Sequence, residues 1–355
     1  MRKRKTLEKI KPYSAGKKYK NTIKMSSNEN PLGPSPAAIR AIKKDLKNIN
    51  TYPDPACSNL KKALAKKYKV TENQIITGNG SDELMVMIAA TYLNPGDNII
   101  TGKNTFSEYE FAANLMDAET QKAPMTDGSF NLDAILSLIN SKTRIIFICN
   151  PNNPTGTYIG KTKILDFIKK IPEDILVVFD HAYAEYVTAA DYPSDRELID
   201  SKKNVVILHT FSKVYGLAGL RIGYAISSPE RIADISLTKQ PFNNNIPAQK
   251  AALAALSDDG FLKKSQNINE KGKKYLYKEL KNMGLFFYPT EANFICIRLD
   301  RDSREAFLEI AKRGVSIRAL DSFGLAGWIR VTIGTEKQNR LFIKALSSYL
   351  SDKGV

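Results

Sequence analysis

The chain has 355 residues, of which 43% are hydrophobic and 25% are charged, as expected for a globular protein with one large and one smaller domain. No apolar run approaches the ~18 residues that a membrane span needs, and the basic N-terminus lacks the apolar stretch of a secretory signal. The net charge of +16 comes mainly from lysines scattered over predicted helices, without a basic motif interleaved with aromatics. We therefore expect neither a membrane nor a nucleic acid among the partners.

The cysteines and histidines indicate a reduced protein without a metal. Cys57, Cys149 and Cys296 are odd in number, far apart and without CxxC spacing, which is typical of structural thiols in a cytoplasmic protein. His181 and His209 do not combine with them at the spacing of a usual zinc site. The sequence thus predicts a cytoplasmic location and no metal.

The first two thirds of the chain predict alternating strands and helices. Residues 1–33 are rich in turn formers and read as an irregular arm, after which Ser35 and Pro36 open a helix. Apolar strands are expected at 74–77, 97–101, 144–149, 175–179, 205–208 and 222–226, and helices at 58–68, 83–93, 107–116, 132–139 and 161–170. Wholly apolar strands alternating with helices predict an α/β fold with a mostly parallel sheet covered by helices on both faces.

The last third predicts a smaller α+β domain. Helices are expected at 229–239, 247–256, 260–283, 303–313 and 335–350, and strands at 286–288, 294–297, 315–317 and 329–333. We expect an N-terminal arm at 1–33, a large domain at 34–250 and a small domain at 251–355.

The segment from Thr210 to Arg221 places a lysine, Lys213, at the end of a buried strand. Burying an ammonium costs several kcal/mol unless the group is paired or neutralised. A Schiff base with an aldehyde removes that charge, and lysine is the side chain whose pKa shifts most readily on burial. The nearby hydroxyls and Arg221 would hold an anion, which a phosphorylated aldehyde supplies.

Three other motifs lie at expected strand ends. Gly78-Asn79-Gly80-Ser81-Asp82 follows a strand and opens a helix, so its N–H groups suit a phosphate. The strand expected at 144–149 is followed by Asn150-Pro151-Asn152-Asn153-Pro154-Thr155-Gly156. The strand expected at 175–179 is followed by Asp180-His181-Ala182-Tyr183. With the Lys213 segment, these motifs resemble those of the fold-type I pyridoxal-phosphate enzymes, the aspartate aminotransferase superfamily, over essentially the whole chain. That resemblance implies the type I transferase fold and pyridoxal 5'-phosphate as the cofactor.

The resemblance also implies roles for individual residues. Lys213 would form the Schiff base and move the substrate proton, Asp180 would pair with the pyridine nitrogen, and Tyr183 would assist at the phenolic oxygen. The cofactor-binding residues would be Lys213, Ser81, Asp82, Phe106, Asn153, Asp180, Tyr183, Thr210, Ser212, Arg221 and, from a neighbouring subunit, Tyr52. The substrate-binding residues would be Arg330, Arg318, Tyr13 and Asn28. Where the family usually has Asp-Glu-Ala-Tyr, this chain has His181, and we expect its side chain to point away from the cofactor in a structural role.

Within the superfamily, the segments Tyr52-Pro53-Asp54 and Ile329-Arg330-Val331-Thr332-Ile333-Gly334-Thr335 most resemble the histidinol-phosphate aminotransferases. This implies a homodimer with shared active sites, in which the arm packs on the small domain and the partner subunit. It also implies transfer of an amino group between glutamate or 2-oxoglutarate and histidinol phosphate or imidazole-acetol phosphate, in L-histidine biosynthesis. Alternatives are an aromatic amino-acid or prephenate aminotransferase, a phosphothreonine decarboxylase, and a catalytically silent regulator that binds the cofactor or a nucleic acid.

Overall fold

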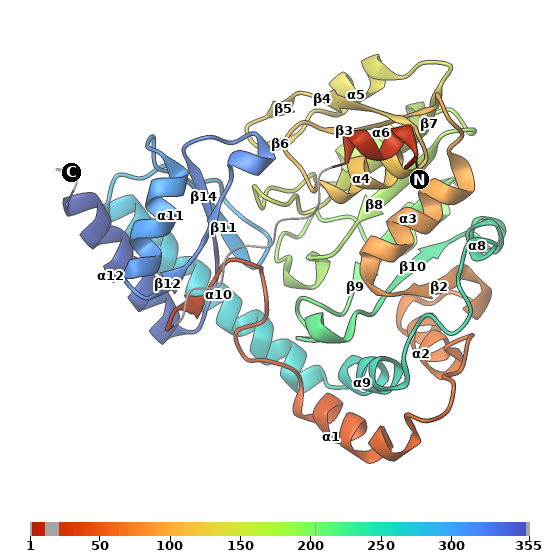
Figure 1. The fold of residues 1–355 in the computed structure, drawn as a ribbon, viewed down its shortest axis with the longest axis horizontal. Helices are drawn as coiled ribbons and strands as arrows, with labels where there is room; N and C mark the ends of the chain where they lie inside the picture. The colour runs from red at the N-terminus through yellow and green to blue at the C-terminus, as the bar shows by residue number, and fades with distance from the viewer. Residues whose placement is uncertain (1, 11–20, 203, 353–355) are drawn as a thin grey trace.

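The computed structural model describes residues 2–10, 21–202 and 204–352, which form two units joined by a long helix (Figure 1). The larger unit is built on a seven-stranded sheet and the smaller one on a three-stranded sheet. Helix α10 (Asp259–Asn282) runs from the larger unit into the smaller one (Figure 1).

The seven-stranded sheet sets the geometry of the larger unit. In spatial order its strands are β2 (Ile75–Gly78), β10 (Gly223–Ser227), β9 (Val205–Thr210), β8 (Leu176–Asp180), β7 (Thr143–Cys149), β3 (Asn98–Gly102) and β4 (Glu119–Ala123). Strand β10 is antiparallel to both of its neighbours, and the remaining pairs are parallel. The carboxyl ends of β2, β7, β8 and β9 therefore lie along one edge of the sheet.

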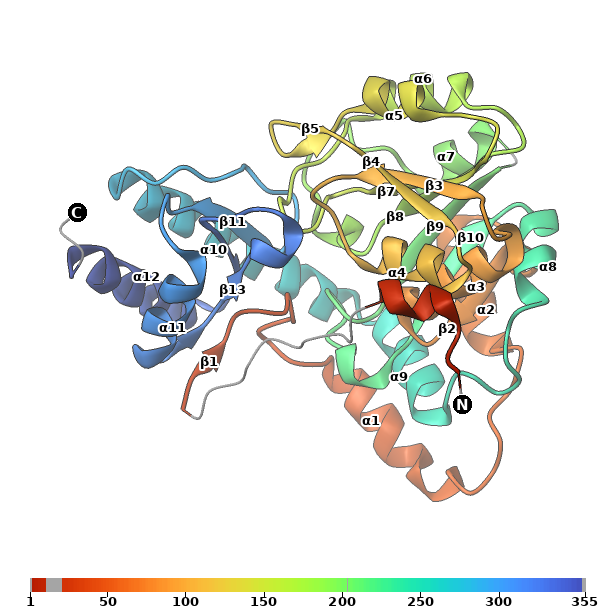
Figure 2. The ribbon, with the colours of Figure 1, turned by 45° about the horizontal axis from the view of Figure 1, so that its top comes forward.

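Helices cover both faces of this sheet, as the wholly apolar strands predicted. The helices of this unit are α1 (Pro36–Asp45), which packs on α9, and α2 (Ser58–Tyr68), α3 (Gly80–Tyr92), α4 (Glu108–Leu115), α5 (Leu132–Leu138), α6 (Lys161–Lys170), α7 (Asp195–Ser201), α8 (Pro229–Ser236) and α9 (Ile246–Leu256). Figure 2 shows α5 and α6 above the sheet and α3 and α4 beneath it. Every residue of β8 and β9 is buried between these layers.

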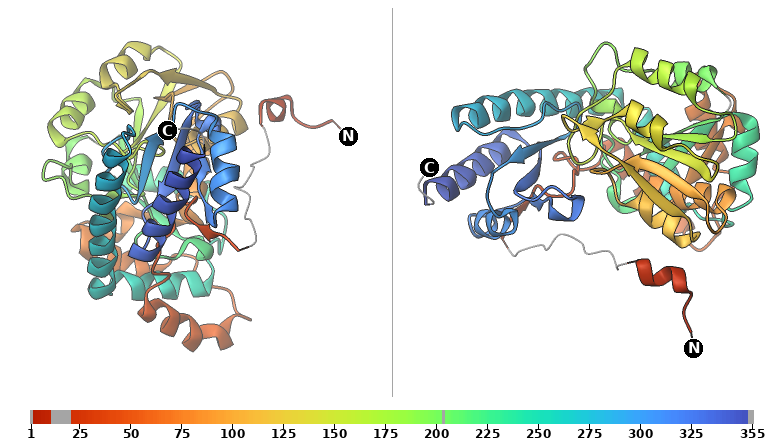
Figure 3. Two further views of the ribbon diagram at one scale, coloured as in Figure 1. Left: turned by 90° about the vertical axis from the view of Figure 1, so that its left-hand side faces the viewer. Right: turned by 90° about the horizontal axis from the view of Figure 1, so that it is seen from above.

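The smaller unit packs helices against a short antiparallel sheet. Its strands are β11 (Phe294–Arg298), β14 (Trp328–Thr332) and β13 (Arg318–Ala319), and its helices are α11 (Ser303–Lys312), α12 (Glu336–Ser351) and the second half of α10. Figure 3 shows α10 and α12 lying side by side. Near the N-terminus, β1 (Ile23–Lys24) pairs in parallel with β12 (Val315–Ser316).

Local sequence explains where several helices begin. The hydroxyl of Ser35 accepts hydrogen bonds from the N–H groups of Ala37 and Ala38 at 3.1 and 3.3 Å, and Pro36 occupies the first helical position of α1. The helices expected at 58–68 and 161–170 are confirmed with the same bounds.

The structure corrects the sequence-based expectations in a few places. The segment 286–288, expected as a strand, forms only an isolated bridge between Phe287 and Ile297. The helix expected from residue 83 begins at Gly80. Strand β4 and the hairpin of β5 (Met125–Thr126) and β6 (Ser129–Phe130) were not predicted, because their residues are largely polar and lack an apolar period.

None of the described helices has both the length and the apolar character required to cross a membrane.

Candidate active site

The residues expected to bind the cofactor gather at the carboxyl edge of the large sheet. Asp180 is the last residue of β8, and Thr210 is the last residue of β9. Helix α3 begins at Gly80, just beyond the end of β2, and Ser81 is buried in its first turn. In open parallel sheets, this edge is where ligands bind.

Lys213 follows β9 and lies partly buried beside Tyr183, with its Nζ 5.5 Å from the centre of the tyrosine ring. Burial and then the positive charge of Arg330 lower the pKa of Lys213 to about 8, although the carboxylates of Asp82 and Asp180 act in the opposite direction. About one fifth of this amine is therefore neutral near pH 7.4, against roughly one in a thousand at the ordinary pKa of 10.5. Only the neutral form serves as a nucleophile or a base.

Asp180 is buried and held by two donors. The hydroxyl of Tyr109 donates to its Oδ2 at 2.7 Å, and the N–H of Ala182 donates to its Oδ1 at 3.1 Å. Burial raises the pKa of Asp180, and both hydrogen bonds counteract this by favouring the ionised form. Tyr109 belongs to no sequence motif and resembles an ordinary core residue, and its ring does stack on Phe147 with centres 4.8 Å apart.

Tyr183 forms a hydrogen bond with a residue of the N-terminal segment. Asn28 donates from its side-chain amide to the Tyr183 hydroxyl at 2.9 Å. The backbone of Asn28 is fixed by Thr332, whose hydroxyl accepts from its N–H, and by Asn293, whose amide donates to its carbonyl. Burial raises the pKa of Tyr183, so the phenol keeps its proton and remains a donor.

Arg330 brings a positive charge from the smaller unit into this site. Its guanidinium donates from Nη1 to the side-chain oxygen of Asn153 and from Nη2 to the carbonyl of Ser26 at 2.9 Å. The residue is only 6% exposed, so its direction is fixed by these contacts. Because Asn153 accepts with its oxygen, its amide nitrogen is the atom that can donate to a ligand.

A second group of residues forms a cradle for an anion. The hydroxyl of Thr210 donates to that of Ser212 at 2.9 Å, and Arg221 lies 3.5 Å from the Ser212 hydroxyl. Arg221 also pairs with Asp82 at 2.9 Å. Gly80 has a φ of +80°, and a Cβ there would lie 2.7 Å from Nη2 of Arg221. Hydroxyls, a guanidinium and the first turn of α3 thus converge on one place, as phosphate sites require.

The other aromatic residues expected in the site differ in their surroundings. Phe106 precedes α4 and sits edge-on to Tyr109, with ring centres 5.8 Å apart. Tyr52 is 81% exposed and stacks on Phe242 at 4.6 Å. Tyr13 lies outside the described residues.

Arg318 and Arg330 lie opposite each other on the neighbouring strands β13 and β14. Directly opposed residues of antiparallel strands share one face of the sheet, and like charges in such a pair are destabilising. An anionic ligand at this face would offset that repulsion.

His181 lies on the other side of the strand from Asp180. Its Nδ1 is 2.8 Å from Asp195, and the second oxygen of the same carboxylate is 2.9 Å from Nε2 of His209. This contact agrees with the structural role expected for His181.

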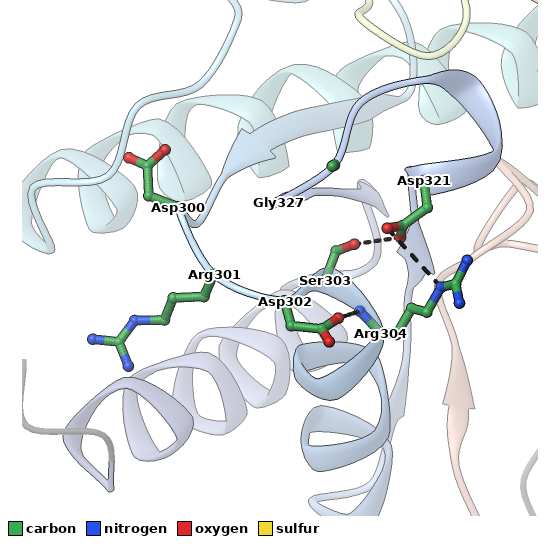
Figure 4. Close-up of a pocket in the computed structure, with 8 residues that line it drawn as sticks. Asp300, Arg301, Asp302, Ser303, Arg304, Asp321 and Gly327 are labelled. Atoms are coloured by element: carbon green, nitrogen blue, oxygen red, sulfur yellow. Dashed lines mark hydrogen bonds and ion pairs between the residues drawn. The ribbon is translucent and has the colours of Figure 1, made fainter.

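One open pocket, at the start of α11, has none of these residues in its lining (Figure 4). Ser303 and Arg304 both face Asp321 there, and the Ser303 hydroxyl donates to that carboxylate (Figure 4). Its lining includes one fully buried residue, Ser303, but no lysine and no buried carboxylate like those of the sheet edge, so we do not place the reaction there.

The side chains at the sheet edge fit pyridoxal phosphate. The buried carboxylate of Asp180 suits a ring-nitrogen cation, and the amine of Lys213, with its lowered pKa, suits an aldehyde. The cradle around Arg221 suits a phosphate, and the clash expected from a Cβ at Gly80 explains the glycine in its wall.

Comparisons with known proteins agree with this geometry. The aminotransferase class I and II family matches residues 20–346. The histidinol-phosphate aminotransferase of Moorella thermoacetica is 47% identical over 96% of this chain and 91% of its own length. The second such enzyme of Carboxydothermus hydrogenoformans is 42% identical over 98% of this chain and 99% of its own.

A solved structure extends the likeness to three dimensions. The histidinol-phosphate aminotransferase of Sinorhizobium meliloti, in complex with pyridoxal-5'-phosphate, superposes with a TM-score of 0.91 at 25% identity, covering 99% of this chain and 98% of the other. The expected α/β transferase fold is thereby confirmed. On both sequence and structure, the chain belongs to the class I and II aminotransferase family.

Proposed function

We propose that this chain is a pyridoxal-phosphate-dependent aminotransferase that transfers the amino group of glutamate to imidazole-acetol phosphate, giving 2-oxoglutarate and histidinol phosphate, in L-histidine biosynthesis. The observation that carries the proposal is the arrangement at one edge of the sheet of the partly buried Lys213, the buried carboxylate of Asp180 and the anion cradle around Arg221. The names of relatives 42–47% identical over nearly the whole chain support the choice of substrates.

Bound pyridoxal phosphate would supply an aldehyde that condenses with amines and a ring that accepts the electrons released when a proton leaves the substrate Cα. Asp180 would hold the ring nitrogen, and Asn153 and Tyr183 would donate to the phenolic oxygen. Phe106 would pack on the ring. The phosphate would lie in the cradle of Ser81, Asp82, Thr210, Ser212 and Arg221.

Lys213 would act twice. As a neutral amine, its Nζ would hold the cofactor covalently through the aldehyde. Once free of the cofactor, the same Nζ would be the base that accepts the proton leaving the substrate Cα. Burial and then the positive charge of Arg330 favour the neutral amine, since both disfavour its protonation.

Asp180 would keep its ring partner protonated. Tyr109 and the N–H of Ala182 favour the ionised carboxylate, which burial alone would disfavour. A cation on the ring nitrogen adds to that preference, so the two charges stabilise each other. Asp180 would thereby favour a proton on the ring nitrogen over a proton on its own carboxyl oxygen.

Arg330 and Arg318 would bind the anionic ends of the substrates. Arg330 is already oriented by Asn153 and the Ser26 carbonyl, and a guanidinium binds a carboxylate or phosphate through two parallel hydrogen bonds. The facing pair of arginines favours substrates with a carboxylate and a phosphate over aromatic keto acids. Tyr13 and Asn28 are proposed as further substrate contacts.

We further propose a cytoplasmic homodimer with shared sites. Tyr52 would reach the cofactor phosphate bound by a second copy, which accounts for a tyrosine 81% exposed beside the exposed ring of Phe242. The three cysteines are free and buried, which suits a reducing compartment.

A half-reaction screen tests the proposed substrates. Protein loaded with pyridoxamine phosphate is mixed separately with imidazole-acetol phosphate, 2-oxoglutarate, phenylpyruvate and prephenate, and the return of the pyridoxal-phosphate absorbance is followed. We expect the first two to react at least about tenfold faster than phenylpyruvate, which has no second anionic group, since a missing anion contact costs about 1.4 kcal/mol or more. A faster reaction with phenylpyruvate or prephenate would favour an aromatic aminotransferase. Release of carbon dioxide from phosphothreonine would favour the decarboxylase.

A further inference from the structure

The carboxylate of Asp195 joins the ends of two sheet strands through a pair of buried histidines. His181 follows β8 directly and His209 is the penultimate residue of β9. The N–H of His181 donates to the carbonyl of Leu208 at 2.9 Å, so the two strands are still paired at this point. Asp195, in the first turn of α7, places one oxygen 2.8 Å from His181 Nδ1 and the other 2.9 Å from His209 Nε2.

The two histidines lie next in sequence to residues of the candidate site. His181 follows Asp180, and His209 precedes Thr210. Because side chains alternate along extended chain, each histidine points to the opposite side from its neighbour. The histidines therefore contact Asp195 behind the sheet edge, while Asp180 and Thr210 face the site in front of it.

We propose that Asp195 is a positioning residue for the cofactor, clamping the ends of β8 and β9 through His181 and His209 so that Asp180 and the segment from Thr210 to Lys213 keep a fixed separation. This inference rests on the proposed function, because that separation matters when one rigid ring must reach Asp180, the phosphate cradle and Lys213 together. An error of about 1 Å in such an arrangement costs roughly a hundredfold in rate.

The surroundings of the clamp keep it rigid. His181 is fully buried and His209 is 1% exposed. The ring of His209 stacks on Tyr224 of β10, with centres 5.0 Å apart and 14° between the planes. Tyr68 of α2 lies at 5.3 Å from the same ring and shares a hydrogen bond of 2.6 Å with the Tyr224 hydroxyl. The imidazoles therefore have little room to turn away from the carboxylate.

The charges favour an ionised carboxylate. Burial opposes ionisation of Asp195, but the two imidazoles outweigh it and hold its pKa well below the ordinary value. Burial likewise opposes protonation of His209, yet the Asp195 charge raises its pKa overall, with Glu185 acting in the same direction and Lys67 against it. The contact is thus a charge-assisted pair, which is stronger and more directional than a neutral one.

The test compares cofactor affinity with fold stability in Asp195→Asn. Cofactor-free protein is titrated with pyridoxal phosphate, the dissociation constant is taken from the absorbance change, and Tm is measured with and without cofactor. We expect affinity to fall at least about tenfold, as for loss of other groups that orient binding residues, and the Tm gain on cofactor binding to shrink. If Tm falls but affinity and the Tm gain equal those of the wild type, Asp195 is only structural and the inference is wrong.

One further pair of variants and a matched control separate the possible outcomes. His181→Asn keeps an N–H near the position of Nδ1 and should retain affinity within about threefold, whereas His181→Leu should lose it, because the carboxylate then lacks a donor. These two variants also decide the question if Asp195→Asn does not fold. As the matched control, Asp258→Asn alters a carboxylate that accepts from Ser35 at 2.6 Å and caps α10, and it should leave the affinity unchanged.

The metal content of the protein and the binding of cofactor by the wild type also test this inference. The three side chains are close enough to hold a metal, so the purified protein is assayed for zinc and manganese before and after a chelator. One tightly held metal per chain would overturn the hydrogen-bonded clamp. If the wild type fails to bind pyridoxal phosphate, the proposed function and this inference both fall. If the wild type binds it and Asp195→Asn binds it equally well, only the inference falls.

Discussion

Replacing Tyr109 with phenylalanine isolates the hydrogen bond that favours ionised Asp180. The ring that stacks on Phe147 remains, and only the hydroxyl that donates to Asp180 at 2.7 Å is lost. A hydrogen bond to a charged group contributes about 1.5–3 kcal/mol, and each pKa unit corresponds to about 1.4 kcal/mol. The pKa of Asp180, already raised by burial, should therefore rise by a further one to two units.

The assay is the pH dependence of kcat/KM, together with the affinity for pyridoxal phosphate. Asp180 is active when ionised, so a higher pKa moves the acid limb of the profile to higher pH by about one to two units. We also expect about 10- to 100-fold weaker cofactor binding, from the same loss of 1.5–3 kcal/mol.

The control for Tyr109→Phe is Tyr92→Phe, which removes a tyrosine hydroxyl that donates to Asp234 at 3.0 Å, away from the site. It should leave both the acid limb and the affinity unchanged. If Tyr109→Phe keeps the wild-type profile and affinity, the hydroxyl does not support Asp180 and the reasoning is refuted.

Three other predictions concern the lysine, the phosphate cradle and the arginine pair. Burial lowers the pKa of Lys213 from 10.5 to about 8, so between pH 8 and 10.5 the unfolded chain carries a proton on Lys213 that the folded chain has lost. The free energy of unfolding of the cofactor-free protein should therefore rise with pH across that window. Lys213→Met should abolish this rise and increase the free energy of unfolding at pH 7, measured by urea denaturation, by about 3 kcal/mol. A variant whose free energy of unfolding depends on pH as in the wild type would contradict this. Gly80→Ala should weaken pyridoxal phosphate binding at least about tenfold, because its Cβ would displace Arg221 and φ is +80°; unchanged affinity in an absorbance titration would exclude Arg221 from the cradle. Arg318→Ala should raise the KM for histidinol phosphate about 10- to 100-fold. An unchanged KM in steady-state kinetics would remove Arg318 from the substrate site.

Most of the central fold was predictable because its strands are buried on both faces. Runs such as 205–208 and 175–179 carry no polar residue, and the structure places them side by side as β9 and β8. The edge strand β4 has the sequence Glu-Thr-Gln-Lys-Ala, which carries no apolar period, and only its pairing with β3 makes it a strand. Pattern reasoning fails where backbone pairing, rather than burial, decides the structure.

The candidate site was predictable where a motif fixed a residue type, and not where contacts are made across the fold. Lys213, Asp180 and Asn153 were singled out by their strings, and the structure brings all three to the same sheet edge. Tyr109 and Asp195 belong to no motif: Tyr109 contacts a carboxylate 71 residues later in the chain, and Asp195 contacts two histidines that each lie 14 residues away. A tyrosine in an apolar helix and an aspartate in a first helical turn are both common for unrelated reasons.

Reduction of the cofactor-loaded protein with borohydride, followed by digestion and mass mapping of the peptides, tests the central claim most directly. We predict one cofactor label per chain, on the peptide that contains Lys213, and none in Lys213→Ala. A label on another lysine, or the same adduct in Lys213→Ala, would contradict the account.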